Sequence, residues 1–194
     1  MSIEVLRAAA RAAVPWKNGG GVTHEVAVHP VGSGFDTFDW RVSIAHVHTA
    51  GPFSSLSGVD RRLAVLEGTL SILIGGQGEA QLSPEAAPLN FAGEESVHAH
   101  PVGGPVTDLN VMTRRAKFIS SLALHQTQHA TDLAGGPASV LVVALTDLVL
   151  KAQTTTWRLS CLDAVRIEGD SRCEIQPQGS QARFYVARIL RANG

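Results

Sequence analysis

The segment GPVTDLNVMTRR (residues 104–115) alternates polar and apolar side chains, as a half-buried β-strand does. Side chains two positions apart in a strand point to the same side. One face of this predicted strand therefore carries Asp108, Asn110, Met112 and Arg114. The opposite face is apolar apart from two threonines. The segment thus predicts a strand with one polar and one apolar face.

Most other apolar segments are also short, and many of them alternate. They are DWRVSIAHV (39–47), RRLAVLEGTLSILI (61–74), SVLVVALTDLVLKA (139–152) and QARFYVARIL (181–190). Clusters of glycine and proline separate them, as turns do. Only EVLRAAARAA (4–13) has a composition typical of a helix, and it is short. Many short strands between turns predict an all-β sandwich or barrel with few short helices.

The chain of 194 residues fits one large domain or two small fused ones. GTLSIL (68–73) resembles TDLVLK (146–151), and FAGEES (91–96) resembles IEGDSR (167–172). Both spacings lie in the range of an internal duplication of roughly 75–80 residues. This faint repeat favours two related halves. We expect LHQTQHATDLAGGP (124–137) to connect them.

Composition excludes several classes of protein. Hydrophobic residues make up 44% and charged residues 17% of the chain, which is enough apolar material for a buried core. The formal net charge of −1 does not favour a nucleic-acid or anionic membrane partner. No apolar run approaches the roughly 20 residues of a membrane span, and charges interrupt the N-terminus, so no signal peptide is expected. We therefore predict a cytoplasmic protein, in which Cys161 and Cys173 are free thiols.

Polar faces recur on the other predicted strands. The side chains that share such a face are Thr23 with Glu25, Arg41 with Ser43, and Arg61 with Glu67. In an antiparallel sheet a polar face is often the solvated outer one. Alternatively, these faces line the inside of a small barrel and form a ligand cavity. The residue types favour the cavity, because most make directed hydrogen bonds and arginine offers a planar fork for carboxylate or phosphate.

The segment PWKNGGGVTHEV (15–26) leads into one of these strands. Its three glycines allow a sharp turn or a close approach of the backbone to a ligand. Lys17 and Asn18 would then bring a charge and an amide to the cavity mouth, and Trp16 a flat apolar wall. The alternative is a glycine-rich turn with a solvated lysine. Neither glycine motif of phosphate and dinucleotide sites is present.

Several motifs, in order along residues 14–115, closely resemble the HutD/Ves family. They are PWKNGGGVTHE, WRVSIAHV, GPFS, DRRLAVLEG and DLNVMTRR. Residues 116–194 carry no matching motif. The resemblance implies a bicupin, which consists of two fused cupin-type β-barrel or jelly-roll domains. The first, at 1–115, would hold the motif-bearing pocket, and the second, at 116–194, would be a degenerate barrel.

The same resemblance places the ligand-binding residues at motif positions. They are Trp16, Lys17, Asn18, Thr23, Glu25, Arg41, Ser43, Arg61, Glu67, Asp108, Asn110 and Arg114. Four of these side chains are cations and three are carboxylates, which predicts a small acidic ligand. Met112 and Arg115 belong to the last motif as well, but Arg115 has the opposite parity to Arg114 and is not expected in the cavity.

Two features bear on a loop and on metal binding. GPFSSLSG (51–58) departs from the family pattern GPFSxFPG at Leu56 and Ser57, so this loop is expected to be looser. Many cupins hold a metal through H-x-H, a nearby Glu and a distant His. HVH (46–48) and HAH (98–100) provide such pairs, but no glutamate follows either at short spacing. We expect structural or surface histidines, with no metal or other cofactor.

Three functions remain open. The resemblance implies an association with bacterial histidine utilisation and a proposed regulatory role without a demonstrated enzymatic activity. The first hypothesis is a sensor of an acidic intermediate, namely urocanate, formiminoglutamate or formylglutamate. The second is a cupin isomerase or hydrolase with Glu67 or Glu25 as general base, although no nucleophilic triad or dyad is visible by spacing. The third is a protein-interaction module, such as a homodimer.

Overall fold

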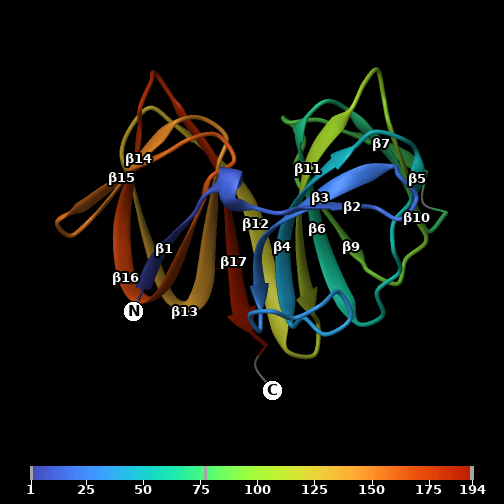
Figure 1. Ribbon diagram of the computed structural model, residues 1–194, viewed down its shortest axis with the longest axis horizontal. Coiled ribbons are helices and arrows are strands. Elements are labelled where there is room, and N and C mark those ends of the chain that lie inside the picture. The colour runs from blue at the N-terminus through green and yellow to red at the C-terminus, as the bar shows by residue number, and fades with distance from the viewer. Residues whose placement is uncertain (1, 77, 193–194) are drawn as a thin grey trace. The chain divides into compact units, whose positions relative to one another are not determined.

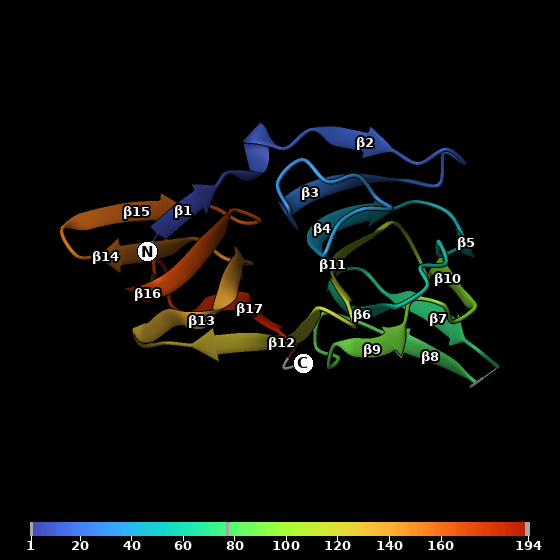
Figure 2. The same ribbon diagram turned by 90° about the horizontal axis from the view of Figure 1, so that it is seen from below.

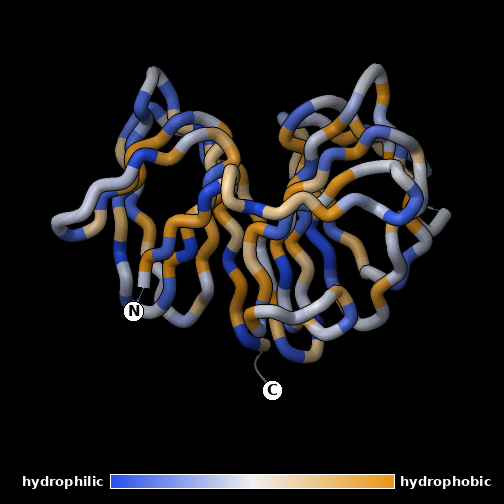
Figure 3. Tube along the Cα trace, viewed as in Figure 1, coloured by the Kyte–Doolittle hydropathy of each residue, from blue (hydrophilic) through white to orange (hydrophobic). Residues whose placement is uncertain are grey.

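The computed structural model describes residues 2–76 and 78–192, and in them the regular structure is β throughout except for one 3-10 turn (Figure 1). The all-β prediction is confirmed. Two compact units are present: residues 11–119, and residues 2–10 together with 120–191. In both, hydrophobic residues follow the strands, while many connecting loops are hydrophilic (Figure 3). No helix among the described residues could cross a membrane.

The unit of residues 11–119 is built from two antiparallel sheets that curve around a common interior (Figure 2). The larger sheet has the strand order β2 (Ala13–Pro15), β3 (Gly21–His29), β4 (Trp40–Val47), β11 (Val106–Arg114), β6 (Val59–Glu67) and β9 (Leu89–Ala92). The smaller sheet has the order β5 (Gly51–Pro52), β10 (Val97–Pro101), β7 (Leu70–Ile74) and β8 (Glu79–Leu82). The strand β11 lies near the middle of the larger sheet and is hydrogen-bonded on both sides.

Two hydrophobic clusters fill the ends of this barrel. The larger cluster includes Leu63, Leu70, Ile72 and Val106, and the smaller consists of Val28, Phe38, Leu56, Val59 and Met112. Along β11, Val106 belongs to the first cluster and Met112 to the second, with Asp108 and Asn110 between them. The polar residues are therefore enclosed between two apolar layers.

Two segments that the sequence predicts as single strands are each divided by a turn. Residues 61–74 are interrupted at Gly68, whose φ is 83°. A side chain there would also come within 2.7 Å of the carbonyl oxygen of Pro105, so glycine is required. Residues 139–152 are divided between β13 (Thr131–Ala144) and β14 (Leu148–Ala152). Apolar periodicity alone did not reveal either turn.

The second unit contains a seven-stranded antiparallel sheet. Its main path runs through β12 (Phe118–Thr127), β17 (Ala182–Arg191), β13, β16 (Ala164–Pro177), β14 and β15 (Thr155–Leu159), and β1 (Ser2–Leu6) pairs with β16. Its core includes Val140, Val142, Leu148, Val165 and Ile167. The prediction of a connecting loop at 124–137 is wrong, because β12 and β13 occupy most of that segment and meet at a short turn.

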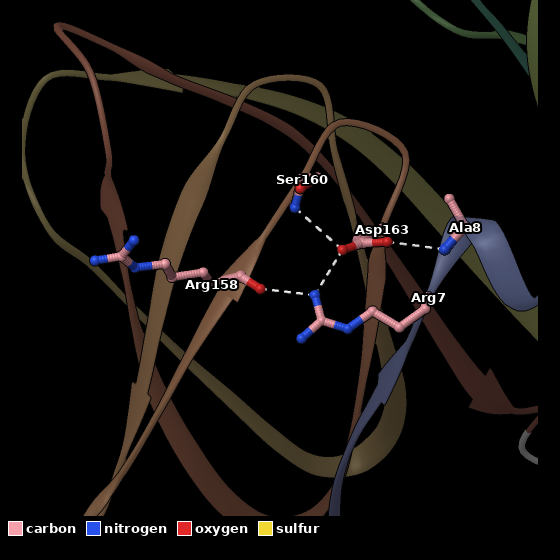
Figure 4. A network of polar contacts seen from close by, with 5 residues as sticks. All are labelled: Arg7, Ala8, Arg158, Ser160 and Asp163. Atoms are coloured by element: carbon pink, nitrogen blue, oxygen red, sulfur yellow. Dashed lines mark hydrogen bonds and ion pairs between the residues drawn. The ribbon is translucent and has the colours of Figure 1, made fainter.

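The N-terminal segment is a strand followed by the 3-10 turn Ala8–Ala10, so the expected helix is absent. Pairing of β1 with β16 overrides the helical propensity of the alanines. Sequence reasoning grouped this segment with the first domain, whereas it pairs within the second unit. Asp163 holds it there: its carboxylate accepts hydrogen bonds from Arg7 Nη1 at 2.7 Å and from the backbone N–H of Ala8 at 2.8 Å and Ser160 at 3.0 Å (Figure 4).

Substitution Asp163→Ala should detach β1 and lower the free energy of unfolding by about 2–3 kcal/mol, because it removes the buried carboxylate that accepts hydrogen bonds from three donors. Denaturant unfolding and hydrogen exchange of residues 2–10 measure both effects. Asp170→Ala, which removes an exposed carboxylate on β16, the strand that follows Asp163, is the matched control. Equal stability of the two variants would contradict this role for Asp163.

Candidate functional site

The unit formed by residues 11–119 contains an open cavity of about 860 Å³. Ten of the twelve residues predicted from the sequence line it: Trp16, Lys17, Asn18, Thr23, Glu25, Arg41, Ser43, Arg61, Asp108 and Asn110. The polar faces of the strands thus point inward, as the cavity hypothesis required, and are not a solvated outer surface. Glu67 and Arg114 are not among the lining residues.

Strand register brings these side chains together. Directly opposite residues of neighbouring antiparallel strands share a face. Asn110 of β11 faces Ser43 of β4, and Met112 lies between Arg41 on β4 and Arg61 on β6. On β3, Glu25 is opposite Ser43. Four strands therefore contribute to one polar row.

Glu67 is turned away from the cavity by a β-bulge. Thr107 pairs with Glu67, but the next residue, Asp108, pairs with Val65, so β6 carries one extra residue at this point. The bulge reverses the parity of the strand beyond Val65. Glu67 consequently shares a face with Thr107, opposite to Asp108, and is exposed. The expectation that Glu67 shares the face of Arg61 is wrong for this reason.

Arg114 anchors a loop and does not reach the cavity. Its Nε donates to the carbonyl oxygen of Phe38 at 2.8 Å, and its Nη2 donates to the carbonyl oxygen of Asp36. The guanidinium also lies over the Phe38 ring, 5.6 Å from its centroid. These contacts occupy the group that we expected to bind a carboxylate. Arg114 therefore fixes the loop that carries Phe35 and Asp36 to the cavity wall.

Glu25 and Arg41 form an ion pair at the wall, with 2.9 Å between Oε2 and Nε. The Arg41 guanidinium also lies 5.6 Å from the centroid of the Phe35 ring. Because the Glu25 side chain is 40% exposed, the pair adds little to stability. It does neutralise two of the charges around the cavity.

Arg61 is the buried cation of the site. It is only 7% exposed, and its guanidinium lies 4.7 Å from the centroid of the Phe53 ring and 5.3 Å from that of Phe91. Nη1 makes one long hydrogen bond of 3.4 Å to the carbonyl oxygen of Ser54, and Nε is buried without a partner. Burial lowers the pKa of Arg61 to about 10, against the opposing effect of Asp108. Arg61 thus stays charged at neutral pH.

Asp108 and Asn110 each present a buried oxygen without a hydrogen-bond partner among the described residues. Asp108 is 2% exposed, and the residues opposite it on the neighbouring strands are Ala45 and Val65, which offer no side-chain donors. Burial raises the pKa of Asp108 to about 7, and Arg61 limits this rise. Buried, unsatisfied polar atoms are rare in folded proteins, so these two oxygens at the cavity wall call for an explanation.

The glycine-rich segment is the turn between β2 and β3 at the cavity mouth. Asn18 Oδ1 accepts the N–H of Gly20 at 3.0 Å, and Gly19 has a φ of 70°, which favours glycine. A side chain at Gly21 would come within 2.6 Å of a backbone carbonyl oxygen and 3.1 Å of the Trp16 ring. The indole of Trp16 is fixed by its 2.7 Å hydrogen bond to Thr23 Oγ1. The glycines therefore set the position of the tryptophan wall.

Sequence reasoning missed the aromatic and loop residues of the site. Phe35, Asp36, Phe53 and Ser54 line the cavity, and Phe91 stacks on Arg61. Phe53 stands in the GPFS motif, which could have revealed it. Leu56, one of the two positions at which this loop departs from the family pattern, is buried in the smaller hydrophobic cluster.

The histidine pairs do not meet the requirements of a metal site. No three His, Cys, Asp or Glu side chains of the described chain converge in a way that could hold a metal ion. His46 accepts or donates a 3.0 Å hydrogen bond with Thr107, on the face of the sheet opposite to Asp108. Both cysteines are free, as expected.

Comparison with known proteins identifies the family. The HutD family model matches residues 8–184. This chain belongs to the HutD family. An uncharacterised 21.2 kDa protein from the hutC 3′ region of Pseudomonas putida is 31% identical over 191 residues and covers 97% of both chains. Protein Ves of Cronobacter sakazakii is 33% identical over 146 residues, which are 73% of this chain and 79% of that protein.

Solved structures agree with this assignment. HutD from Pseudomonas fluorescens SBW25 superimposes with a TM-score of 0.82 at 26% identity, covering 99% of this chain and all of that one. A conserved protein of unknown function from Pseudomonas aeruginosa PAO1 gives a TM-score of 0.88 at 26% identity, covering 98% and 100%. A cupin barrel protein from Leptotrichia buccalis gives 0.62 at 10% identity over 92% of each chain, which shows the cupin fold.

The Asp108→Asn variant should gain stability relative to the wild type as pH rises from 5 to 8. The raised pKa of Asp108 means that ionisation opposes folding between the unfolded-state pKa and about 7. The gain should be roughly 2 kcal/mol, while the loss of the Arg61 counter-charge adds an offset that does not vary with pH in this range. Urea unfolding at several pH values measures it. A stability difference that is constant from pH 5 to 8 would contradict the burial of an ionisable Asp108.

Proposed function

We propose that this HutD-family protein binds a small carboxylic acid in its barrel cavity and acts as a sensor or regulator of histidine utilisation. The observation that carries the proposal is Arg61, a buried guanidinium that borders the cavity and keeps Nε without a partner. A carboxylate is the ligand group that best satisfies a guanidinium, since it accepts two parallel hydrogen bonds. Stacking on Phe53 holds the guanidinium plane for such a contact.

The charges around the cavity support an acidic ligand under one condition. Glu67 and Arg114 do not line the cavity, whereas Asp36, which was not predicted, does. The charged lining residues are therefore the cations Lys17, Arg41 and Arg61 and the carboxylates Glu25, Asp36 and Asp108. The two sets balance when Asp108 is ionised. They leave an excess of one positive charge when Asp108 is protonated. The predicted excess of positive charge therefore depends on Asp108.

Asn110 suggests which group the ligand carries besides its carboxylate. Asn110 Oδ1 can accept a hydrogen bond and has no donor among the described residues. A ligand with a carboxylate for Arg61 and an N–H group for Asn110 would satisfy both. Urocanate, formiminoglutamate and formylglutamate each carry a carboxylate and, in the appropriate tautomer, an N–H group. These names come from the family association with histidine utilisation and form the test panel.

The enzymatic alternative loses one of its two proposed bases from the cavity and has the other in an ion pair. Glu67 lies outside the cavity, and Glu25 is paired with Arg41. A regulator need only bind, and the cavity offers the buried Arg61 and two buried oxygens without partners among the described residues. The homodimer and any protein partner stay predictions.

Substitution Arg61→Gln should weaken binding of the panel acid that stabilises the wild type by at least about 100-fold, or about 3 kcal/mol, because it removes a desolvated charge–charge contact. Thermal shift and calorimetry measure this loss. A saturating ligand at 100 times its Kd should stabilise the wild type by about 2.7 kcal/mol.

Arg62→Gln is the matched control for this experiment. Arg62 is the next residue on β6 and points to the opposite side, where its Nη1 donates to Asn90 Oδ1 at 2.6 Å. It should bind the acid as the wild type does. Equal affinities of the Arg61 and Arg62 variants, or no stabilisation of the wild type by any panel acid, would rule out the proposed function.

A further inference from the structure

We propose that the acid enters the cavity together with one proton, and that Asp108 carries this proton as the donor of an O–H···O hydrogen bond to the ligand carboxylate. The inference rests on the proposed function and deepens it. It makes Asp108 a binding residue that recognises a carboxylate by donating to it. It also links ligand binding to pH.

The surroundings of Asp108 leave it dependent on Arg61. Its Oδ1 is buried without a partner, and the residues across the sheet on both sides, Ala45 and Val65, are apolar. Arg61 is the cation whose charge acts on it. An ionised Asp108 therefore relies on this guanidinium, because Asp108 is only 2% exposed.

A bound acid would compete for the same guanidinium. If the ligand carboxylate occupies the edge of Arg61 that carries the free Nε, two carboxylates share one cation in a buried site. Like charges at such a distance raise the pKa of one group until it takes up a proton. The protonated carboxyl then has an O–H to donate, whereas the carboxylate could only accept.

The other charged groups that face this part of the cavity do not offer an alternative proton site. From β3 and β4, Glu25 and Arg41 are already paired with each other. At the mouth, Lys17 and Asp36 belong to solvent-exposed segments. From β6, the facing charge is Arg61 itself. Asp108 is thus the carboxyl whose charge state can change with the ligand.

In the free protein, Asp108 is already partly protonated near neutral pH. Burial raises the pKa of Asp108 to about 7, so near neutral pH a substantial share of the protein holds the proton before binding. Above that pH each ligand must bring a proton from solvent. The association constant should then fall by at least about tenfold between pH 6 and pH 8.5.

Calorimetry in two buffers counts the protons directly. Each of the three acids is titrated into the full chain at pH 7.5, in phosphate and in Tris, whose heats of ionisation differ. The difference in binding heat gives the number of protons taken up. We expect between about 0.5 and 1 proton per ligand bound, given the pKa near 7. Asp108→Asn should bind with no proton uptake and with an affinity that is flat from pH 6 to 8.5.

Glu67→Gln is the matched control, because it removes a carboxylate of the same barrel that lies outside the cavity. It should take up as many protons as the wild type. Binding without proton uptake, or uptake that persists in Asp108→Asn, would overturn this inference and leave the proposed function standing. Absence of binding by all three acids would overturn both.

Discussion

The site depends on the register of one strand. Because β11 is hydrogen-bonded to β4 on one side and β6 on the other, its inward face cannot be moved without breaking both ladders. That face carries Asp108 and Asn110 between two apolar clusters. Burying a carboxyl and an amide in this way costs several kcal/mol unless partners satisfy them. The fold thus holds a region that is more stable when something binds to it.

Three buried polar residues of the cavity differ from the charged residues that anchor loops and termini. Arg61, Asp108 and Asn110 each keep a polar atom without a partner, whereas Arg114, Arg115 and Asp163 have theirs satisfied by neighbouring residues. These three atoms border one cavity, and the satisfied charges hold loops and termini in place. Natural proteins tend to break the rules of polar satisfaction at functional sites and to obey them elsewhere. This contrast separates the binding residues from the anchoring ones.

Strand alternation predicted the all-β fold and the polar strand residues of the cavity wall from sequence, because side chains alternate regularly wherever a strand is uninterrupted. It failed where the backbone departs from that regularity. The bulge beyond Val65 turns the Glu67 side chain to the opposite face of the sheet. Arg114 binds the backbone carbonyl oxygens of residues 36 and 38, which lie in a loop that no local sequence pattern encodes. The stacking of Phe53 and Phe91 on Arg61 depends on a loop and on a second strand, which the pattern of β6 does not encode. Pairing of β1 with β16 overrode the helical propensity of residues 4–13 for a similar reason.

A crystal structure of the chain with bound acid at pH 6 tests the central claim most directly. The account predicts a ligand carboxylate within hydrogen-bonding distance of both Arg61 Nε and Asp108 Oδ1, with the oxygen–oxygen separation short enough to require a shared proton. An acid bound elsewhere on the barrel, or one in the cavity that leaves Arg61 and Asp108 uncontacted, would contradict it.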